Sequence, residues 1–129
     1  MSWTNLENKV VVVTGGAAGI GLSVVKGFVE VGAKVMIADF AEEVGIQAVE
    51  EANQAGNGEA AFAKCDVTSK EDVDALIGAT INRWGSIDVL VNNAGINIPR
   101  LLVDPAGKEE MTEEVWDKVF AVNVKGQFL

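Results

Sequence analysis

The chain has 129 residues, 49% hydrophobic and 22% charged, which indicates one globular domain with a single core. Its formal charge of −9, without any cluster of Lys and Arg, argues against binding to nucleic acid or to an anionic membrane. A single cysteine, Cys65, excludes an intrachain disulfide and a zinc cluster, and we expect no metal site. The start lacks the apolar core of a signal peptide, and no apolar run approaches the ~18 residues of a membrane-spanning helix, so we expect a reducing, cytoplasmic setting.

Short apolar segments alternate along the chain with segments of helical periodicity. Strands are predicted at residues 9–14, 33–39, 60–64 and 87–91. Helices are predicted from about residue 20 to a stop at Gly32, over 41–55, from a Ser69 cap to Gly85, and from a Thr112 cap to near the last residue. This alternation predicts an α/β fold, a Rossmann-type doubly wound parallel sheet with helices on both faces, in a single domain over residues 1–129.

The same periodicities predict how the elements pack. Asp72 follows the Ser69 cap as an aspartate variant of the capping box. The fourth strand is expected as an unpaired apolar edge, and helices that would face later elements are expected to expose apolar surface. We therefore expect the isolated chain to be marginally stable or to aggregate. The residues expected to face inward are Val44, Ala48, Val49 and Ala52 in the second helix, and Val73, Leu76, Ile77, Thr80 and Ile81 in the third.

Glycines cluster at the turn that follows the first strand. Gly15, Gly19 and Gly21 stand there, with Gly16 and Ile20 between them. Small residues allow the backbone to turn sharply and to approach a phosphate, and the next helix directs free N–H groups at the anion. A turn that serves only strand–helix packing is the alternative, which the position after the first buried strand disfavours. The turn therefore predicts a dinucleotide site that includes Gly15, Gly19, Ile20 and Gly21.

The spacing of these glycines is G-x-x-x-G-x-G, which differs from the G-x-G-x-x-G fingerprint and from a Walker P-loop. Thr14-Gly-Gly-Ala-Ala-Gly-Ile-Gly21 resembles the T-G-x-x-x-G-I-G turn of the short-chain dehydrogenase/reductase family. Asn92-Asn-Ala-Gly95, after the fourth strand, is similar to a second motif of that family. A flavodoxin-like or methyltransferase domain is disfavoured because both motifs occur together.

Asp39 ends the second predicted strand, where a carboxylate accepts hydrogen bonds from a ribose 2′-hydroxyl and repels a 2′-phosphate. An ordinary strand-end aspartate that caps the next helix is the alternative. NADP-preferring relatives usually carry a basic residue at positions that are Ala17, Ala18 and Phe40 here. We therefore expect NAD as cofactor, with NADP disfavoured, and contacts from Asp39 and Phe40.

The resemblance implies roles for residues after the third and fourth strands. Asp66 is expected to contact the adenine amino group, with Val67 near the ring, although Asp-Val-Thr-Ser is also a good turn and helix cap. The Asn-Asn-Ala-Gly motif is expected to hold strand and loop together and to line the ribose side of the cofactor. It contributes Asn93, Ala94 and Gly95.

Of the catalytic residues of the family, only the helix asparagine has a counterpart, Asn123, which the resemblance places in a proton relay through a water. A polar residue that bonds within a helix bundle is the alternative for Asn123. The family's Tyr-x-x-x-Lys motif is absent, since the chain contains no tyrosine. We therefore expect an NAD-dependent oxidoreductase of a secondary alcohol, incomplete at its C-terminus after Leu129 and inactive as it stands. A non-catalytic nucleotide-binding module is the alternative.

The loop over residues 96–105 is the least generic stretch. It is similar to family members that act on sorbitol 6-phosphate, which implies a small-molecule substrate, a polyol or sugar phosphate. Arg100 is a candidate for bidentate binding of a substrate phosphate, and an exposed loop arginine is the alternative. The resemblance also implies a homodimer or homotetramer for a full-length member, assembled through helices of which the first begins near Thr112.

Overall fold

The computed structural model describes residues 4–129, and the predicted alternation of strands and helices is confirmed. A π-helical turn at Ala121–Lys125 interrupts the last helix, which the sequence pattern did not indicate. The elements, in chain order, are β1 (Val10–Thr14), α1 (Gly19–Glu30), β2 (Lys34–Asp39), α2 (Glu42–Asn53), β3 (Glu59–Lys64), α3 (Lys70–Trp84), β4 (Val89–Val91), α4 (Glu113–Phe120) and α5 (Gly126–Phe128).

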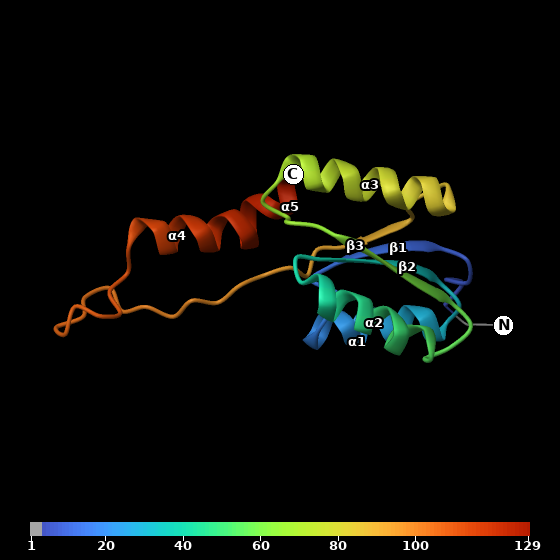
Figure 1. The fold of residues 1–129 in the computed structure, drawn as a ribbon, viewed down its shortest axis with the longest axis horizontal. Coiled ribbons are helices and arrows are strands. Elements are labelled where there is room, and N and C mark those ends of the chain that lie inside the picture. Colours follow the sequence, from blue (N-terminus) through green and yellow to red (C-terminus); the bar gives the residue numbers. More distant parts are fainter. Residues whose placement is uncertain (1–3) are drawn as a thin grey trace.

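The strands form one parallel sheet in the order β3-β2-β1-β4. β1 lies inside it, in register with β2 through Val12 and Met36 and with β4 through Val13 and Val91. All of β1 is buried, as its unbroken run of valines predicts. Figure 1 shows α1 and α2 on one face of the sheet and α3 on the other, so the predicted fold class is confirmed. The strand order changes direction at β1, and ligands of such sheets bind beyond the carboxyl ends of the strands at this point.

Two apolar layers fill the space between sheet and helices. The predicted inward positions of α2 are wrong at Val44, which is 42% exposed, because the buried residues are Gly45, Ala48 and Ala52. A Cβ on Gly45 would lie only 2.1 Å from Cε1 of Phe62, so the glycine is what allows α2 to lie this close to β3.

The predicted inward face of α3 is too wide. Leu76 and Thr80 are buried, whereas Ile77 and Ile81 are 37% and 44% exposed. Leu76 and Thr80 lie one helical turn apart, so α3 rests on β2 and β3 through a narrow row of side chains. The buried hydroxyl of Thr80 donates to the carbonyl of Leu76 at 2.8 Å, which satisfies it within the helix.

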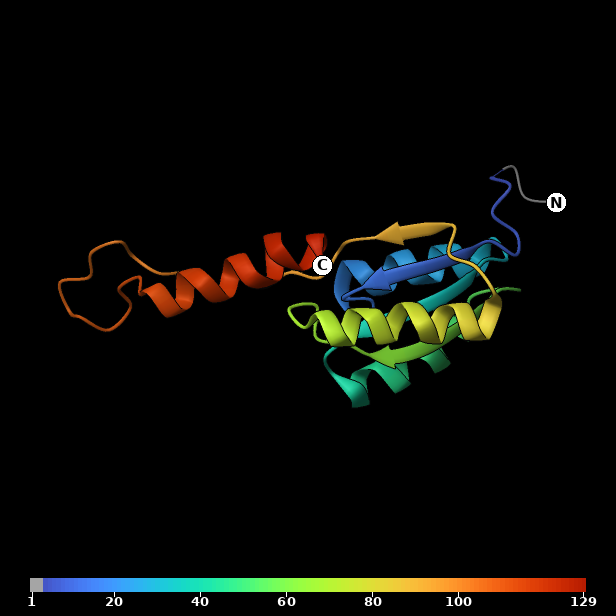
Figure 2. The ribbon, with the colours of Figure 1, turned by 90° about the horizontal axis from the view of Figure 1, so that it is seen from above.

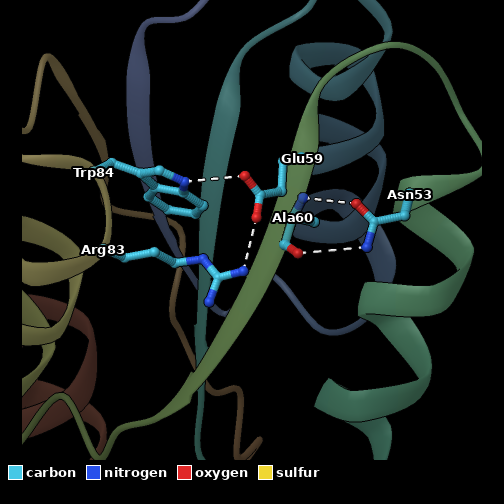
Figure 3. A network of polar contacts seen from close by, with 5 residues as sticks. All are labelled: Asn53, Glu59, Ala60, Arg83 and Trp84. Atoms are coloured by element: carbon cyan, nitrogen blue, oxygen red, sulfur yellow. Dashed lines mark hydrogen bonds and ion pairs between the residues drawn. The ribbon is translucent and has the colours of Figure 1, made fainter.

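The two edges of the sheet differ. On β3, the side-chain amide of Asn53 accepts from the N–H of Ala60 at 2.7 Å and donates to its carbonyl at 3.4 Å, as a neighbouring strand would (Figure 3). Glu59 accepts from Arg83 at 2.7 Å and from the indole N–H of Trp84 at 3.1 Å, so β3 is also tied to the end of α3. These bonds, that from Arg83 first, lower the pKa of Glu59. β4 forms the other edge, as predicted.

The chain leaves the sheet after β4 and returns through α4, which extends away from the domain (Figures 1 and 2). The hydroxyl of Thr112 accepts from the N–H of Val115, so the predicted N-cap is confirmed. No residue of α4 is buried, and the rings of Trp116 and Phe120 stack with centroids 4.8 Å apart in an exposed position. The expectation of exposed apolar surface is therefore confirmed. None of the helices within residues 4–129 has the length and hydropathy needed to cross a membrane.

Candidate functional site

A cleft of about 740 Å³ opens at the carboxyl ends of the strands. This volume is in the range of ~300–1,000 Å³ typical of sites for small molecules and cofactors. Most of the residues predicted from the sequence meet there, although they come from four separate turns. Those that line the cleft are Gly15, Ile20, Gly21, Asp39, Phe40, Asp66, Val67, Asn93, Ala94 and Gly95, whereas Gly19 and Asn123 do not.

The glycine turn joins β1 to α1 in a conformation that depends on its glycines. Gly15 and Gly19 have φ values of +66° and +58°, in the left-handed region that other residues rarely adopt. A Cβ on Gly21 would lie 2.1 Å from the carbonyl oxygen of Gly15, so α1 starts directly against the turn. A Cβ on Gly19 would meet nothing within 4 Å, which places Gly19 at an open part of the backbone.

The N-terminus of α1 is unlike those of the other long helices. Its cap residue, Ala18, offers no side-chain acceptor, and its first turn holds no acidic residue. The first turns of α2, α3 and α4 all hold acidic residues, and α3 and α4 are also capped by Ser69 and Thr112. The first turn of α1 therefore has no capping or acidic side chain of its own, and its free N–H groups and the positive end of its dipole form an arrangement suited to a phosphate.

The carboxylate of Asp39 is held at the edge of the cleft by backbone N–H groups. Oδ2 accepts from Ala17 at 3.1 Å, and Oδ1 accepts from Ala41 at 3.1 Å. Each oxygen has two lone pairs, so both retain capacity for a further donor. Phe40 follows, and this residue is 68% exposed. The cleft thus has an acceptor with a fixed orientation at this end, beside an aromatic surface.

Asp66 begins the turn after β3. One of its oxygens accepts from the N–H of Thr68 at 2.9 Å and from its hydroxyl at 2.6 Å, and these bonds lower the pKa of Asp66. Ser69 accepts from the N–H of Asp72 at 3.2 Å, so the predicted cap is confirmed. The capping box is not closed in the predicted way, because the carboxylate of Asp72 accepts from the N–H of Asp66 at 2.9 Å. This bond tightens the turn beneath the cleft.

Thr14 joins the glycine turn to the Asn-Asn-Ala-Gly loop. Its hydroxyl oxygen accepts from the N–H groups of Asn93 and Ala94 at 3.0 and 3.1 Å and donates to the carbonyl of Val91 at 3.4 Å. The side-chain amide of Asn93 donates to the carbonyl of Gly15 at 3.1 Å. The motif therefore holds strand and loop together, and the two walls of the cleft are one hydrogen-bonded unit.

Asn123 lies in the π-helical turn, outside the lining of the cleft. Its side chain accepts from the N–H of Ile96 at 2.8 Å and donates to the carbonyl of Ile96 at 2.9 Å. Its own carbonyl accepts from the side chain of Gln127 at 3.0 Å. The amide of Asn123 thus fastens the loop after β4 to the last helix, and its predicted place in a proton relay stays a prediction.

Arg100 is likewise outside the cleft, and its guanidinium donates to the carbonyl of Pro99 at 2.8 Å. The loop that follows is closed by Asp104, whose carboxylate accepts from the N–H groups of Ala106, Lys108 and Glu109. These three bonds lower the pKa of Asp104, the bond from Glu109 first. The loop therefore has a defined shape of its own at a distance from the cleft.

Sequence reasoning missed part of the lining. Cys65 is buried beneath the cleft, and burial, with smaller contributions from Asp72 and Asp66, raises the pKa of its thiol to about 11. Thr68 had a local signal, because a hydroxyl two residues after Asp66 typically closes such a turn. Lys118 had none, since α4 reaches the cleft only through the tertiary fold. The missed lining residues are Ala18, Ala38, Cys65, Thr68, Ile96, Lys118, Ala121 and Val122.

The chain is similar to known proteins in sequence and in fold. The family model described as short chain dehydrogenase matches residues 9–129. Sorbitol-6-phosphate 2-dehydrogenase of Klebsiella pneumoniae is 41% identical over 131 residues, covering 98% of this chain and 46% of that protein. Short-chain dehydrogenase reductase 3a of Arabidopsis thaliana is 38% identical over 126 residues, with coverage of 98% and 46%. A short chain dehydrogenase structure from Mycobacterium smegmatis aligns with a TM-score of 0.86 at 39% identity, over 95% of this chain and 49% of that one. The chain thus spans about half the length of these relatives.

Proposed function

The chain belongs to the short-chain dehydrogenase family. We propose that it binds NAD, as the cofactor-binding part of an oxidoreductase that interconverts a secondary alcohol and a ketone. The observation that carries the proposal is the pairing of an uncapped α1 with the fixed carboxylate of Asp39 in one cleft. The first suits a pyrophosphate, and the second suits a ribose with a free 2′-hydroxyl.

The preference for NAD over NADP follows from charge. A 2′-phosphate would lie against the Asp39 carboxylate, whereas a 2′-hydroxyl donates to it. Ala17 and Ala18, at the turn that faces Asp39, supply no positive charge to offset the repulsion. We therefore expect NADH to bind at least about tenfold more tightly than NADPH, which corresponds to ~1.4 kcal/mol.

Different residues of the chain would bind the different parts of the cofactor. The turn after β1 would hold the pyrophosphate, Asp66 and Val67 the adenine, and Asn93 with its neighbours the second ribose. When the cofactor is bound, its nicotinamide ring accepts or donates the hydride. Proton transfer to or from the substrate oxygen needs a positioned acid or base, and the 129 residues contain no tyrosine for this role. We accordingly expect this chain to bind NADH without turning over an alcohol.

For the substrate we propose a polyol or sugar phosphate, supported by the 41% identity to a relative that is a sorbitol-6-phosphate 2-dehydrogenase. Arg100 remains the candidate for the substrate phosphate. Replacing Arg100 with Ala in an active enzyme that contains this sequence should raise the KM for a phosphorylated polyol. An unchanged KM would rule out this role.

We also propose a homo-oligomer. Trp116, Phe120, Val124 and Phe128 recur at every fourth position of the last helix and are all exposed, which leaves an apolar stripe for a second subunit.

Titration of the chain with NADH and NADPH, followed by nucleotide fluorescence, tests the cofactor assignment. Saturable NADH binding with weaker NADPH binding supports the proposal. Absence of binding by either nucleotide contradicts it. The alternative of a non-catalytic module is tested by assaying the longest natural form of the protein with NAD and secondary alcohols. Dehydrogenation of any of these alcohols would exclude a non-catalytic module.

A further inference from the structure

A lysine that the cofactor assignment does not use lies beside Asp39. Lys64 ends β3 and is paired with Asp39 in the register of β2 and β3, so the two side chains leave the same face of the sheet. The ammonium nitrogen of Lys64 lies 5.6 Å from the centroid of the Phe40 ring, and Phe40 lines the cleft next to Asp39. Lys64 is not itself part of the lining of the cleft, but its ammonium group lies over the ring of Phe40, which is.

Lys64 is free to change partner. It is exposed, and among residues 4–129 it forms no ion pair. A contact between a cation and an aromatic ring is weak at an exposed site, whereas a hydrogen bond between an ammonium and a phosphate is charge-assisted and stronger. The flexible stem of a lysine allows its ammonium to leave the ring for an anion nearby.

We propose that Lys64 is a second determinant of cofactor choice, a cation that favours a 2′-phosphate and is opposed by the carboxylate of Asp39. The proposal rests on the proposed function, because it requires the adenosine moiety at this end of the cleft. Preference for NAD is then a balance between two neighbouring opposite charges. Removing the charge of Asp39 alone should therefore make the site accept a 2′-phosphate, without the introduction of a basic residue.

Adenosine 5′-monophosphate and adenosine 2′,5′-bisphosphate test the proposal, since they differ only in the 2′-phosphate. Their dissociation constants are measured calorimetrically for the chain and its variants. Asp39→Asn should tighten binding of the bisphosphate relative to the monophosphate at least ~10-fold. Adding Lys64→Gln to Asp39→Asn should remove most of this gain, and adding Lys64→Arg should retain it. Because the effect is electrostatic, it should shrink as salt is raised.

Two lysines serve as controls in the Asp39→Asn background. Lys34 begins β2 at the opposite end of the sheet, and Lys34→Gln removes the same charge without touching the cleft. Lys118 lines the cleft from α4, and Lys118→Gln tests whether that ammonium is the one that binds the 2′-phosphate. We expect only Lys64→Gln to abolish the gain.

The outcomes separate the two proposals. If the wild-type chain binds neither nucleotide, the adenosine site and the role of Lys64 are both refuted. If the monophosphate binds but the Lys64→Gln double variant keeps the gain, or Lys118→Gln removes it, the role of Lys64 is refuted and the cofactor site stands.

Discussion

Replacing Gly21 with alanine tests whether the glycine turn has the shape that nucleotide binding requires. The added Cβ would lie 2.1 Å from the carbonyl oxygen of Gly15 and 2.6 Å from the amide nitrogen of Asn93, and real Cβ atoms essentially never approach within 3.0 Å. The turn and the start of α1 must therefore separate by about 0.9 Å, the difference between 2.1 and 3.0 Å. A shift of this size disrupts the hydrogen bond from Asn93 to Gly15.

The expected cost has two parts. Overpacking of this kind costs about 1–3 kcal/mol, and a lost hydrogen bond adds about 0.5–1.5 kcal/mol. We expect the free energy of unfolding of Gly21→Ala to fall by about 2–4 kcal/mol. The backbone N–H groups that face the cleft move with the turn, so affinity for NADH should fall at least ~10-fold.

Gly27 in the same helix is the matched control. A Cβ on Gly27 would meet nothing within 4 Å, so Gly27→Ala should stabilise α1 by about 0.5–1 kcal/mol and leave NADH affinity unchanged. Urea unfolding followed by circular dichroism gives the stabilities, and NADH fluorescence gives the affinities. A Gly21→Ala variant as stable as the wild type and equal to it in NADH affinity would refute the role of Gly21 in shaping the turn.

Three further predictions concern groups around the cleft and the β3 edge. Cys65 is 2% exposed with a pKa raised to about 11, so a thiol reagent at pH 8 should label it only in urea, and rapid labelling of the native chain would contradict its burial. Thr14→Val removes the acceptor of two N–H groups and should lower the free energy of unfolding by about 1–3 kcal/mol. The hydroxyl of Thr80 bonds only within its own helix, so Thr80→Val should cost less. Equal costs in urea unfolding would count against the Thr14 network. The lowered pKa of Glu59 means that its stabilisation is present at neutral pH and declines as the pH falls below the ordinary value of 4.5. Glu59→Gln should therefore reduce stability by less than ~1 kcal/mol at pH 7 and by less still at pH 3, and a loss that does not depend on pH would contradict the ion pair.

The features that could be predicted from the sequence are those with local causes. Ser69 and Thr112 cap their helices, and Gly85 ends α3 with a φ of +84°, because each acts on backbone groups within a few residues. The valines of β1 predict a buried strand on their own. Residues that follow the carboxyl ends of parallel strands gather at one edge of the sheet. The sequence alone therefore predicts that Gly15, Asp39, Asp66 and Asn93 meet in one cleft.

The features that could not be predicted depend on contacts between distant segments. The pairing of Asn53 with β3 needs the end of α2 to lie beside Ala60. The exposure of Ile77 depends on the narrow contact between α3 and the sheet, and the periodicity of α3 does not predict the width of that contact. The π-helical turn places Asn123 against Ile96, and neither residue signals that partner locally. Lys64 reaches Phe40 only because β2 and β3 pair in a particular register.

Binding at the cleft and the integrity of the sheet are coupled through the same few groups. β4 is a three-residue edge strand, so its ladder with β1 is short, and the bonds of Thr14 and Asn93 add to it. Those bonds also fix the two loops that line the cleft. A nucleotide that binds only the folded cleft stabilises it by about 2.7 kcal/mol at a hundredfold excess over its dissociation constant. Because the loops and β4 share these hydrogen bonds, this stabilisation should extend to β4. Nucleotide binding should therefore slow hydrogen exchange of the β4 amides more than that of the β3 amides.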